Sequence, residues 1–190
     1  FLYCNMVGAQ DELIFDGESL AFNSNGDCIG QGEVFKEDLV LVNLERTQAL
    51  EIHNTSREEK MVRALCLGVA DYFKKTGHTE AVLGLSGGID SALVGAIATE
   101  ALGSENIHGI SLPSKFSSNH SLSDAQLLAE NLGIDYRIIP IQEAVDGMET
   151  VLHPHFLGLE PNVAEENLQA RARGNLLMAL SNKFGWMVLS

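Results

Sequence analysis

Short apolar runs and longer amphipathic stretches alternate along most of this chain. Each run is typical of a buried strand, and each stretch has the period of a helix. We expect strands at residues 81–86, 107–112, 136–141 and from 186 onward. We expect helices between them at residues 90–102, 121–132, 142–152 and 163–183. Strands separated by helices of this length form βαβ units, so the pattern predicts an α/β fold with a doubly wound parallel sheet.

A further helix precedes the first of these strands. Ser56 and Glu59 have the spacing of a capping box, and Gly77 is a typical helix stop. Its apolar stripe consists of Val62, Leu65, Val69 and Phe73. Because residues 51–56 form a polar connector before this helix, we expect a domain boundary there. The predicted domains are residues 1–50 and 51–190.

The first 42 residues have a β texture and contain no complete catalytic constellation. Strand-like runs lie at residues 11–17, 19–22, 34–35 and 39–42, with a turn at residues 23–27. A segment of this size is too small to form a stable sheet core alone. We therefore expect it to belong to a larger sheet domain that begins earlier. The missing initiator Met also suggests a fragment.

Composition and charge exclude several classes of protein. Apolar residues make up 45% of the chain, which is typical of a soluble globular protein. The net charge of −14 disfavours nucleic acid or an anionic membrane as the main partner. No apolar stretch approaches the roughly 20 residues that span a bilayer. This charge still permits ATP, because phosphate can be bound locally by backbone dipoles and a metal.

Cysteine and histidine usage predicts neither a disulfide frame nor a metal site. Cys4, Cys28 and Cys66 are widely spaced and form no Cys-x-x-Cys pair. They favour free thiols in a reducing compartment, such as the cytoplasm. His153 and His155 flank a proline and could ligate a metal, but with no carboxylate or cysteine nearby a loop is the favoured interpretation.

Residues 84–91 carry the clearest chemistry. They read Gly-Leu-Ser-Gly-Gly-Ile-Asp-Ser and join a predicted strand to a predicted helix. Paired glycines let the backbone approach phosphate oxygens, and the helix N-terminus favours negative charge. Ser86 and Ser91 can add hydroxyl donors, whereas Asp90 beside a polyanion makes sense only with a cation between them. Mg²⁺ is the usual choice, being held by one or two carboxylates plus phosphates.

This segment is not the common P-loop, which requires Gly-x-x-x-x-Gly-Lys-Ser/Thr, because no lysine lies between Gly84 and Ala98. Ser-Gly-Gly-x-Asp-Ser resembles instead the loop of the ATP pyrophosphatases, which bind the pyrophosphate end of ATP and release it whole. The alternative is a tight strand-to-helix turn with an Asp near the helix N-terminus.

Two other segments could contact a substrate. Ser114 and Lys115 follow a predicted strand, so they open on the same sheet edge and could reach phosphate or ribose, although an ordinary polar loop is the alternative. Asn167 and Arg171 are four residues apart on one helix face and suit a carboxylate or phosphate. Arg173 is expected to point elsewhere. The alternative there is an amphipathic helix with Glu/Arg pairs.

Together these motifs resemble the glutamine-dependent NAD synthetases. The similar segments are residues 85–91, 113–118 and 165–174, and residues 7–17 resemble late strands of that family's nitrilase-like glutaminase domain. The match runs nearly end to end in the expected order. It departs at Ala9, where a second Gly is usual, and at Lys115-Phe116, where Arg/Lys-Tyr is common.

The resemblance implies an ATP-driven amidation of deamido-NAD to NAD through an acyl-adenylate, with ammonia supplied from glutamine. It implies Mg²⁺ at Asp90, deamido-NAD contacts at Asn167 and Arg171, and a homo-oligomer. The implied ATP-binding residues are Gly84, Leu85, Ser86, Gly87, Gly88, Ile89, Asp90, Ser91, Ser114 and Lys115.

The family's glutaminase residues would lie before Phe1, and a second metal-binding Glu would lie after Ser190. No catalytic set is therefore complete within the chain, and we expect these 190 residues alone neither to hydrolyse glutamine nor to complete NAD synthesis.

Two other interpretations stay open on the sequence. One is a different ATP pyrophosphatase, such as a GMP synthetase, an asparagine synthetase or a tRNA-modifying enzyme. The charge of −14 opposes the last of these, and the helix with Asn167 and Arg171 opposes the others. The second interpretation is a non-catalytic scaffold that keeps the nucleotide-binding fold.

Overall fold

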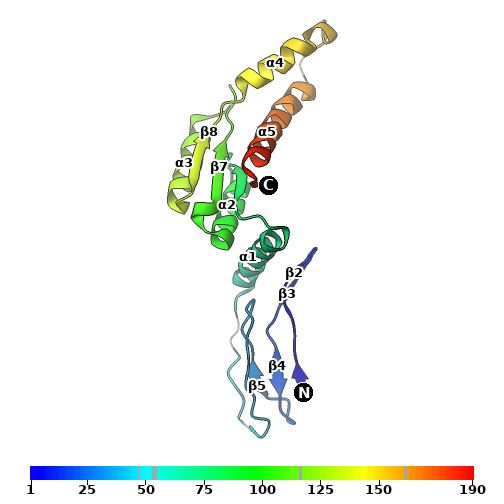
Figure 1. Cartoon of the computed structure of the whole chain (residues 1–190), viewed down its shortest axis with the longest axis vertical. Coiled ribbons are helices and arrows are strands. Elements are labelled where there is room, and N and C mark those ends of the chain that lie inside the picture. Colours follow the sequence, from blue (N-terminus) through cyan, green and yellow to red (C-terminus); the bar gives the residue numbers. More distant parts are fainter. Residues whose placement is uncertain (47, 53–54, 116, 161) are drawn as a thin grey trace. The chain divides into compact units, whose positions relative to one another are not determined.

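The computed structural model describes residues 1–46, 48–52, 55–115, 117–160 and 162–190 (Figure 1). Its contacts divide the chain into two compact units, Phe1–Gly77 and His78–Ser190. The division falls after the first helix, whereas the sequence places a domain boundary before it, and the domain assignment stays a prediction. Phe116 belongs to the Lys115-Phe116 pair at which the sequence departs from the family pattern, and it lies outside the described residues. Among those described, no helix is long and apolar enough to cross a bilayer.

The first unit begins with two small antiparallel sheets. Strands β2 (Val7–Gln10) and β3 (Leu13–Asp16) form a hairpin. Strands β1 (Leu2–Tyr3), β4 (Leu20–Phe22) and β5 (Cys28–Gln31) form the other sheet, in the order β1-β4-β5. The turn predicted at residues 23–27 is confirmed, since Asn23 donates its backbone N–H to the carbonyl of Asp27 at 3.0 Å.

The strands predicted at residues 34–35 and 39–42 are wrong. Val34 forms only an isolated bridge with Gly17, and residues 39–42 pair with no strand. The alternation that suggested a strand is nevertheless present, because Leu39 and Leu41 are 85% and 90% exposed while Val40 and Val42 lie near Gly30. A Cβ on Gly30 would lie 2.8 Å from Val42 Cγ2. The segment therefore packs by its side chains without a backbone ladder.

Helix α1 (Arg57–Thr76) packs on the β2–β3 hairpin. As predicted, the Ser56 hydroxyl accepts the Glu59 N–H, and Gly77 ends the helix in the left-handed conformation. Asp71 ties the helix to the hairpin by accepting the Ala9 N–H at 2.8 Å. This hydrogen bond lowers the pKa of Asp71, against the opposing effect of burial and with help from the Lys75 ammonium.

The second unit is a parallel α/β sheet, which confirms the predicted fold class. Its strands are β6 (Ala81–Gly84), β7 (Ile107–Ser111), β8 (Asp135–Ile138) and β9 (Met187–Leu189). Their order is β8-β7-β6-β9, and every pair is parallel. The chain therefore reverses its direction of winding at β6, and the crevice beyond the carboxyl end of such a strand is where doubly wound sheets bind ligands.

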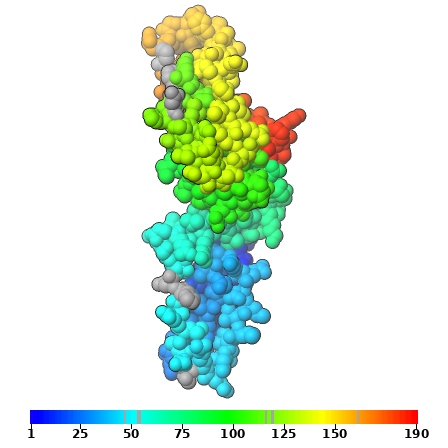
Figure 2. Space-filling model, turned by 90° about the vertical axis from the view of Figure 1, so that its left-hand side faces the viewer, coloured from blue at the N-terminus to red at the C-terminus, as the bar shows by residue number. Residues whose placement is uncertain are grey.

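Four α-helices, each near its predicted position, connect and cover these strands. They are α2 (Ile89–Leu102), α3 (Asn119–Leu132), α4 (Gln142–Leu152) and α5 (Val163–Phe184). Short 3₁₀ turns lie at Ser104–Asn106 and at His153–His155. Helices α3 and α5 lie on opposite faces of the sheet (Figure 1), and the α3 side is seen as a yellow-green surface in Figure 2.

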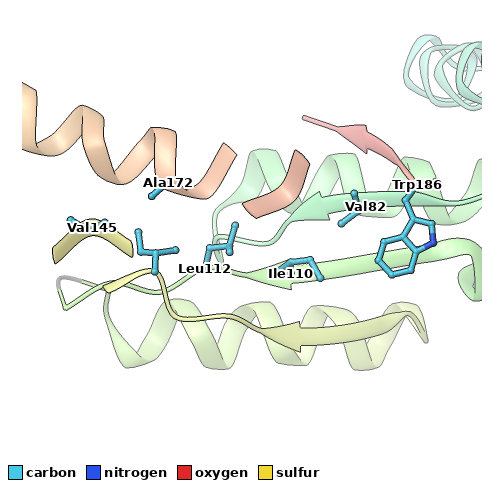
Figure 3. Close-up of a cluster of buried hydrophobic side chains, with 7 residues drawn as sticks. Val82, Ile110, Leu112, Val145, Ala172 and Trp186 are labelled. Carbon is cyan, nitrogen blue, oxygen red and sulfur yellow. The ribbon is translucent and has the colours of Figure 1, made fainter. Parts of the chain in front are cut away.

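One hydrophobic cluster of the second unit lies between the sheet and the α4–α5 pair (Figure 3). Val82 of β6 and Ile110 of β7 are fully buried there, and Ala172 is the α5 contribution. The other members are Leu112, Ile141, Val145 and Trp186. Because both faces of the central strands are covered, β6 reads as a continuous apolar run, and every residue of β7 is buried, including His108 and Ser111.

A polar cluster anchors the other strand ends. The buried His108 ring lies between two carboxylates, with Nδ1 at 3.0 Å from Asp135 and Nε2 at 2.8 Å from Glu80. Trp186 stacks on this ring with centroids 3.6 Å apart and donates its Nε1–H to Glu80. Burial opposes ionisation of Asp135, but hydrogen bonds from His108 and Arg137 outweigh it and lower the Asp135 pKa. The cluster links β6, β7, β8 and the start of β9.

We predict that Asp71→Asn loosens the first unit in a pH-dependent way. The amide oxygen of the substituted side chain can still accept the Ala9 N–H, so at neutral pH only the charge assistance is lost, which should cost about 1 kcal/mol. The folded-state pKa of Asp71 lies below 3.8, so its stabilisation is complete above that value and is lost as pH falls through the lowered pKa. The difference between wild type and variant should therefore shrink in acid.

Hydrogen exchange of the β2, β3 and α1 amides measures this effect. Trp186, the only tryptophan, reports separately on the second unit and should not respond. Asp11→Asn, at an exposed turn position that either residue tolerates, is the matched control. An equal change in exchange for both variants would contradict the role of Asp71.

Candidate functional site

The turn after β6 leaves the sheet within two residues. Leu85 is still part of it, since it is 3% exposed and donates its N–H to Ile110 at 2.8 Å. Ser86 is exposed, and Gly87 has a φ of +79°, a left-handed conformation that favours glycine. Gly88 then precedes the first residue of α2, with no side chain capping the helix. The strand, turn and helix thus occur in the predicted order.

The two serines of the turn hold its backbone open. Ser91 Oγ donates to the Gly88 carbonyl at 3.0 Å, and it lies 3.1 Å from Ser86 Oγ. The Ser86 N–H donates to Ser91 Oγ at 3.3 Å, and the Gly88 N–H donates to Ser86 Oγ at 3.2 Å. Among the described residues, the partners of these two amides are rotatable hydroxyls of the same turn, at the long end of hydrogen-bonding distance. Anion oxygens can replace the hydroxyls without breaking the sheet.

The first turn of α2 adds further donors and one acid. The first α-helical bond in this stretch runs from the Ala92 N–H to the Gly88 carbonyl, so the amides of residues 89–91 precede the intrahelical ladder. Asp90 and Ile89 are exposed there. No group of three or more potential metal-ligating side chains occurs among the residues that the structure describes. A single exposed carboxylate nevertheless fits Mg²⁺, which commonly takes one carboxylate together with ligand phosphates.

A second loop and helix abut this turn. Ser118 caps α3, accepting the Ser121 N–H at 3.1 Å, and the two hydroxyls are 2.9 Å apart. The backbone of Ser121 lies so close to Gly87 that a Cβ there would be 2.4 Å from the Ser121 carbonyl oxygen. Gly87 is therefore required by both its conformation and the space available.

The turn opens into a pocket of about 530 Å³ at the carboxyl edge of the sheet. Its walls are mostly apolar, with serine hydroxyls and one arginine among them. The lining residues are Gly84, Leu85, Ser86, Ile110, Ser111, Leu112, Pro113, Ser117, Ser118, Ser121, Leu122, Arg173 and Leu177. Such a combination suits a flat apolar group joined to an anion.

A hydrogen-bond relay braces the floor of this pocket. The Tyr136 hydroxyl donates to Ser111 Oγ at 2.8 Å, and Ser111 Oγ donates to the Leu85 carbonyl at 2.9 Å. Ser111 is 2% exposed, so the relay is shielded from water. It joins Tyr136 of β8 and the last residue of β7 to the residue at which the turn begins.

The structure brings together only some of the residues that the sequence singled out. Gly84, Leu85 and Ser86 line the pocket. Ser114 and Lys115 lie on the same sheet edge but outside that lining, where the Ser114 N–H bonds Ser117 Oγ and the Lys115 N–H bonds Gln142. Their predicted contacts with ATP stay predictions.

Helix α5 presents its two arginines on different faces. Asn167 and Arg171 are exposed and do not line this pocket, whereas Arg173, which the sequence predicts to point away from Arg171, lines it. Arg173 is half-buried and donates its Nε–H to the Leu112 carbonyl at 3.0 Å. The sequence contains one signal for this placement, because Arg173 and Leu177 are four residues apart and so share a helix face. The roles predicted for Asn167 and Arg171 stay predictions.

Residues 61–190 match the family model described as NAD synthase. The chain is 49% identical to a glutamine-dependent NAD(+) synthetase from Synechocystis and 44% identical to one from Thermotoga maritima, covering 100% and 99% of this chain. A solved glutamine-dependent NAD+ synthetase from Acinetobacter baumannii, in complex with ADP, is 41% identical over the whole chain with a TM-score of 0.89. The chain spans only 35%, 39% and 37% of these three relatives.

The space around the turn leads to a prediction about its two glycines. Gly87→Ala should destabilise the second unit by about 2 kcal/mol or more, because it adds backbone strain and a clash with backbone atoms. Gly88→Ala should cost under about 1 kcal/mol, since Gly88 has a φ of −91° and its Cβ would meet only the movable Ser86 hydroxyl at 3.2 Å. Urea unfolding followed by Trp186 fluorescence compares them. Equal losses of stability would contradict this account.

Proposed function

This chain belongs to the NAD synthase family, as its motifs predict, and we propose that it forms part of an enzyme that converts deamido-NAD to NAD with ATP and ammonia. Glutamine would supply the ammonia, as the names of the relatives indicate. The observation that carries the proposal is the turn at residues 84–91, of which Gly84, Leu85 and Ser86 line a mostly apolar pocket, while the Ser86 and Gly88 amides donate to hydroxyls of the same turn. Family membership sets aside the GMP synthetase, asparagine synthetase and tRNA-modifying alternatives.

The pocket and the turn suit the two ends of ATP. Leu85, Ile110 and Leu112 offer apolar walls for the base, and the serines offer hydroxyls to the ribose. The amides of the turn and of the first turn of α2 would hold the pyrophosphate end, where the helix N-terminus favours negative charge. The bound ADP of the Acinetobacter baumannii relative supports a nucleotide as the ligand.

The reaction needs a good leaving group more than a protein nucleophile. The substrate carboxylate oxygen would bond to the α-phosphorus while the bond from that phosphorus to the pyrophosphate oxygen breaks. The electron pair leaves with pyrophosphate, so charge accumulates where the turn amides point. Ammonia would then attack the carboxyl carbon of the acyl-adenylate and AMP would leave, with the surplus proton passing to solvent.

Mg²⁺ fits this site through Asp90, whose exposed carboxylate stands in the first turn of α2. When bound, it would neutralise phosphate charge and polarise the bond that breaks. Asn167 and Arg171, on the exposed face of α5, are proposed to contact deamido-NAD. Their planar amide and guanidinium groups suit carboxylate or phosphate.

We also propose that residues 1–50 end a nitrilase-like glutaminase domain and that residues 51–190 begin the synthetase domain. The family match begins at residue 61, inside α1, while the two bacterial relatives align over 99–100% of the chain. The helix would thus start the synthetase domain in sequence although it packs on the β2–β3 hairpin. A homo-oligomer and a reducing, cytoplasmic location stay predictions of the family resemblance and of the three free cysteines.

Nucleotide binding by the 190-residue chain tests the proposal. We expect calorimetry to detect binding of MgATP to this chain. Asp90→Asn should weaken MgATP binding at least about tenfold and should weaken the binding of metal-free ATP less. Glu100→Gln, an exposed acid on the same helix, is the matched control and should bind normally. If the wild-type chain does not bind MgATP, the proposal fails and the interpretation as a non-catalytic scaffold replaces it. In the longer protein, turnover should release AMP and pyrophosphate, and ADP with phosphate would exclude the mechanism.

A further inference from the structure

Arg173 is the charged residue of the pocket. Of the described residues that line it, Arg173 alone carries a charge, and its neighbours there are apolar side chains and serines. This is notable in a chain with 26 acidic and 12 basic residues. Arg63 and Arg137 pair with Glu59 and Asp135. No described carboxylate lies within ion-pair distance of Arg173.

The guanidinium is anchored but not saturated by the protein. Its Nε–H donates to the Leu112 carbonyl at 3.0 Å, the one hydrogen bond that the described residues show for this side chain. An arginine has five N–H donors in a rigid plane, so the two terminal nitrogens remain available to the pocket. A half-buried cation without a counter-ion is costly, and an anionic ligand would remove that cost.

The bond to Leu112 also fixes where the cation stands. Leu112 belongs to the apolar wall suited to the base, while Ser86, at the start of the anion-binding turn, lines the same pocket. Arg173 therefore lines the same pocket as the apolar wall suited to the base and the first serine of the proposed pyrophosphate turn. The phosphate joined directly to the nucleoside is the group of ATP that connects those two regions.

Resting on the function proposed above, we infer that Arg173 binds the α-phosphate of ATP and then the phosphate of the acyl-adenylate. A guanidinium can donate two parallel hydrogen bonds to the two non-bridging oxygens of one phosphate. The same oxygens are present before and after pyrophosphate leaves. Arg173 would thus hold the reacting phosphorus in place while the bond from the carboxylate oxygen forms and the bond to pyrophosphate breaks.

A bracing role would have a different signature. If Arg173 served only to hold the Leu112 loop, its removal would disturb the wall that receives the base. The affinities for adenosine, AMP and MgATP would then all fall by the same factor. If Arg173 binds the α-phosphate, its removal should lower the affinity only for ligands that carry that phosphate.

The test compares these three ligands by calorimetry on the 190-residue chain. Arg173→Met keeps much of the side-chain length but removes the donors and the charge. We expect AMP and MgATP to bind at least about tenfold more weakly, the range for a lost charge-assisted bond, and adenosine to change less than about threefold. Lys183→Met, which removes an exposed charge from the same helix, should leave all three affinities unchanged.

A second variant keeps the test decisive if Arg173→Met unfolds, which Trp186 fluorescence would reveal. Arg173→Lys retains the charge but not the planar pair of donors. The affinity for AMP should therefore fall by about three- to tenfold, and the affinity for adenosine should not change. Equal weakening of all three ligands, or none for any, would overturn the assignment of Arg173 while the proposed function stood. Failure of the wild-type chain to bind MgATP would instead remove both proposals.

Discussion

The turn between β6 and α2 depends on the close approach of two backbones, at Gly87 and Ser121. No side chain fits between them, so the start of α3 can lie directly against the turn. That contact brings the Ser118 and Ser121 hydroxyls beside Ser86 and gives the pocket one of its sides. The parallel sheet makes the approach possible, because the carboxyl ends of β6 and β7 meet at one edge and both connections open there.

The relay from Tyr136 through Ser111 to Leu85 gives this edge its rigidity. Both hydroxyls donate to a neighbouring segment, so β8, the end of β7 and the residue after β6 are linked without a charged group. The opposite edge is held by a charged and aromatic cluster around His108 instead. The carboxylates of this cluster lie at one end of the sheet, whereas the pocket at the other end is lined by apolar side chains, hydroxyls and, among the described residues, a single cation.

A chain of net charge −14 can bind an anion because binding is decided over a few ångströms. Exposed charges more than about 10 Å apart are largely screened at physiological salt, whereas amides, hydroxyls and a partly buried guanidinium act at contact distance. Asp90 is the one acid of the turn, and a divalent cation converts it from a repulsive group into part of the site. Net charge thus bears on what the surface attracts but does not decide what the pocket binds.

Local sequence determined the elements whose causes are local. The caps of α1 at Ser56 and Gly77, the four parallel strands and the glycine turn after β6 all follow from the identity and spacing of a few neighbouring residues.

Tertiary structure alone decided the rest. Residues 39–42 have a strand's alternation, yet strand formation needs a partner backbone that the pattern cannot supply. Asn167 and Arg171 share a polar face, but which face of α5 meets the pocket depends on how the helix packs on β6, and that packing selects Arg173. Sequence spacing specifies which side chains point together, whereas only the packed fold specifies what they point at.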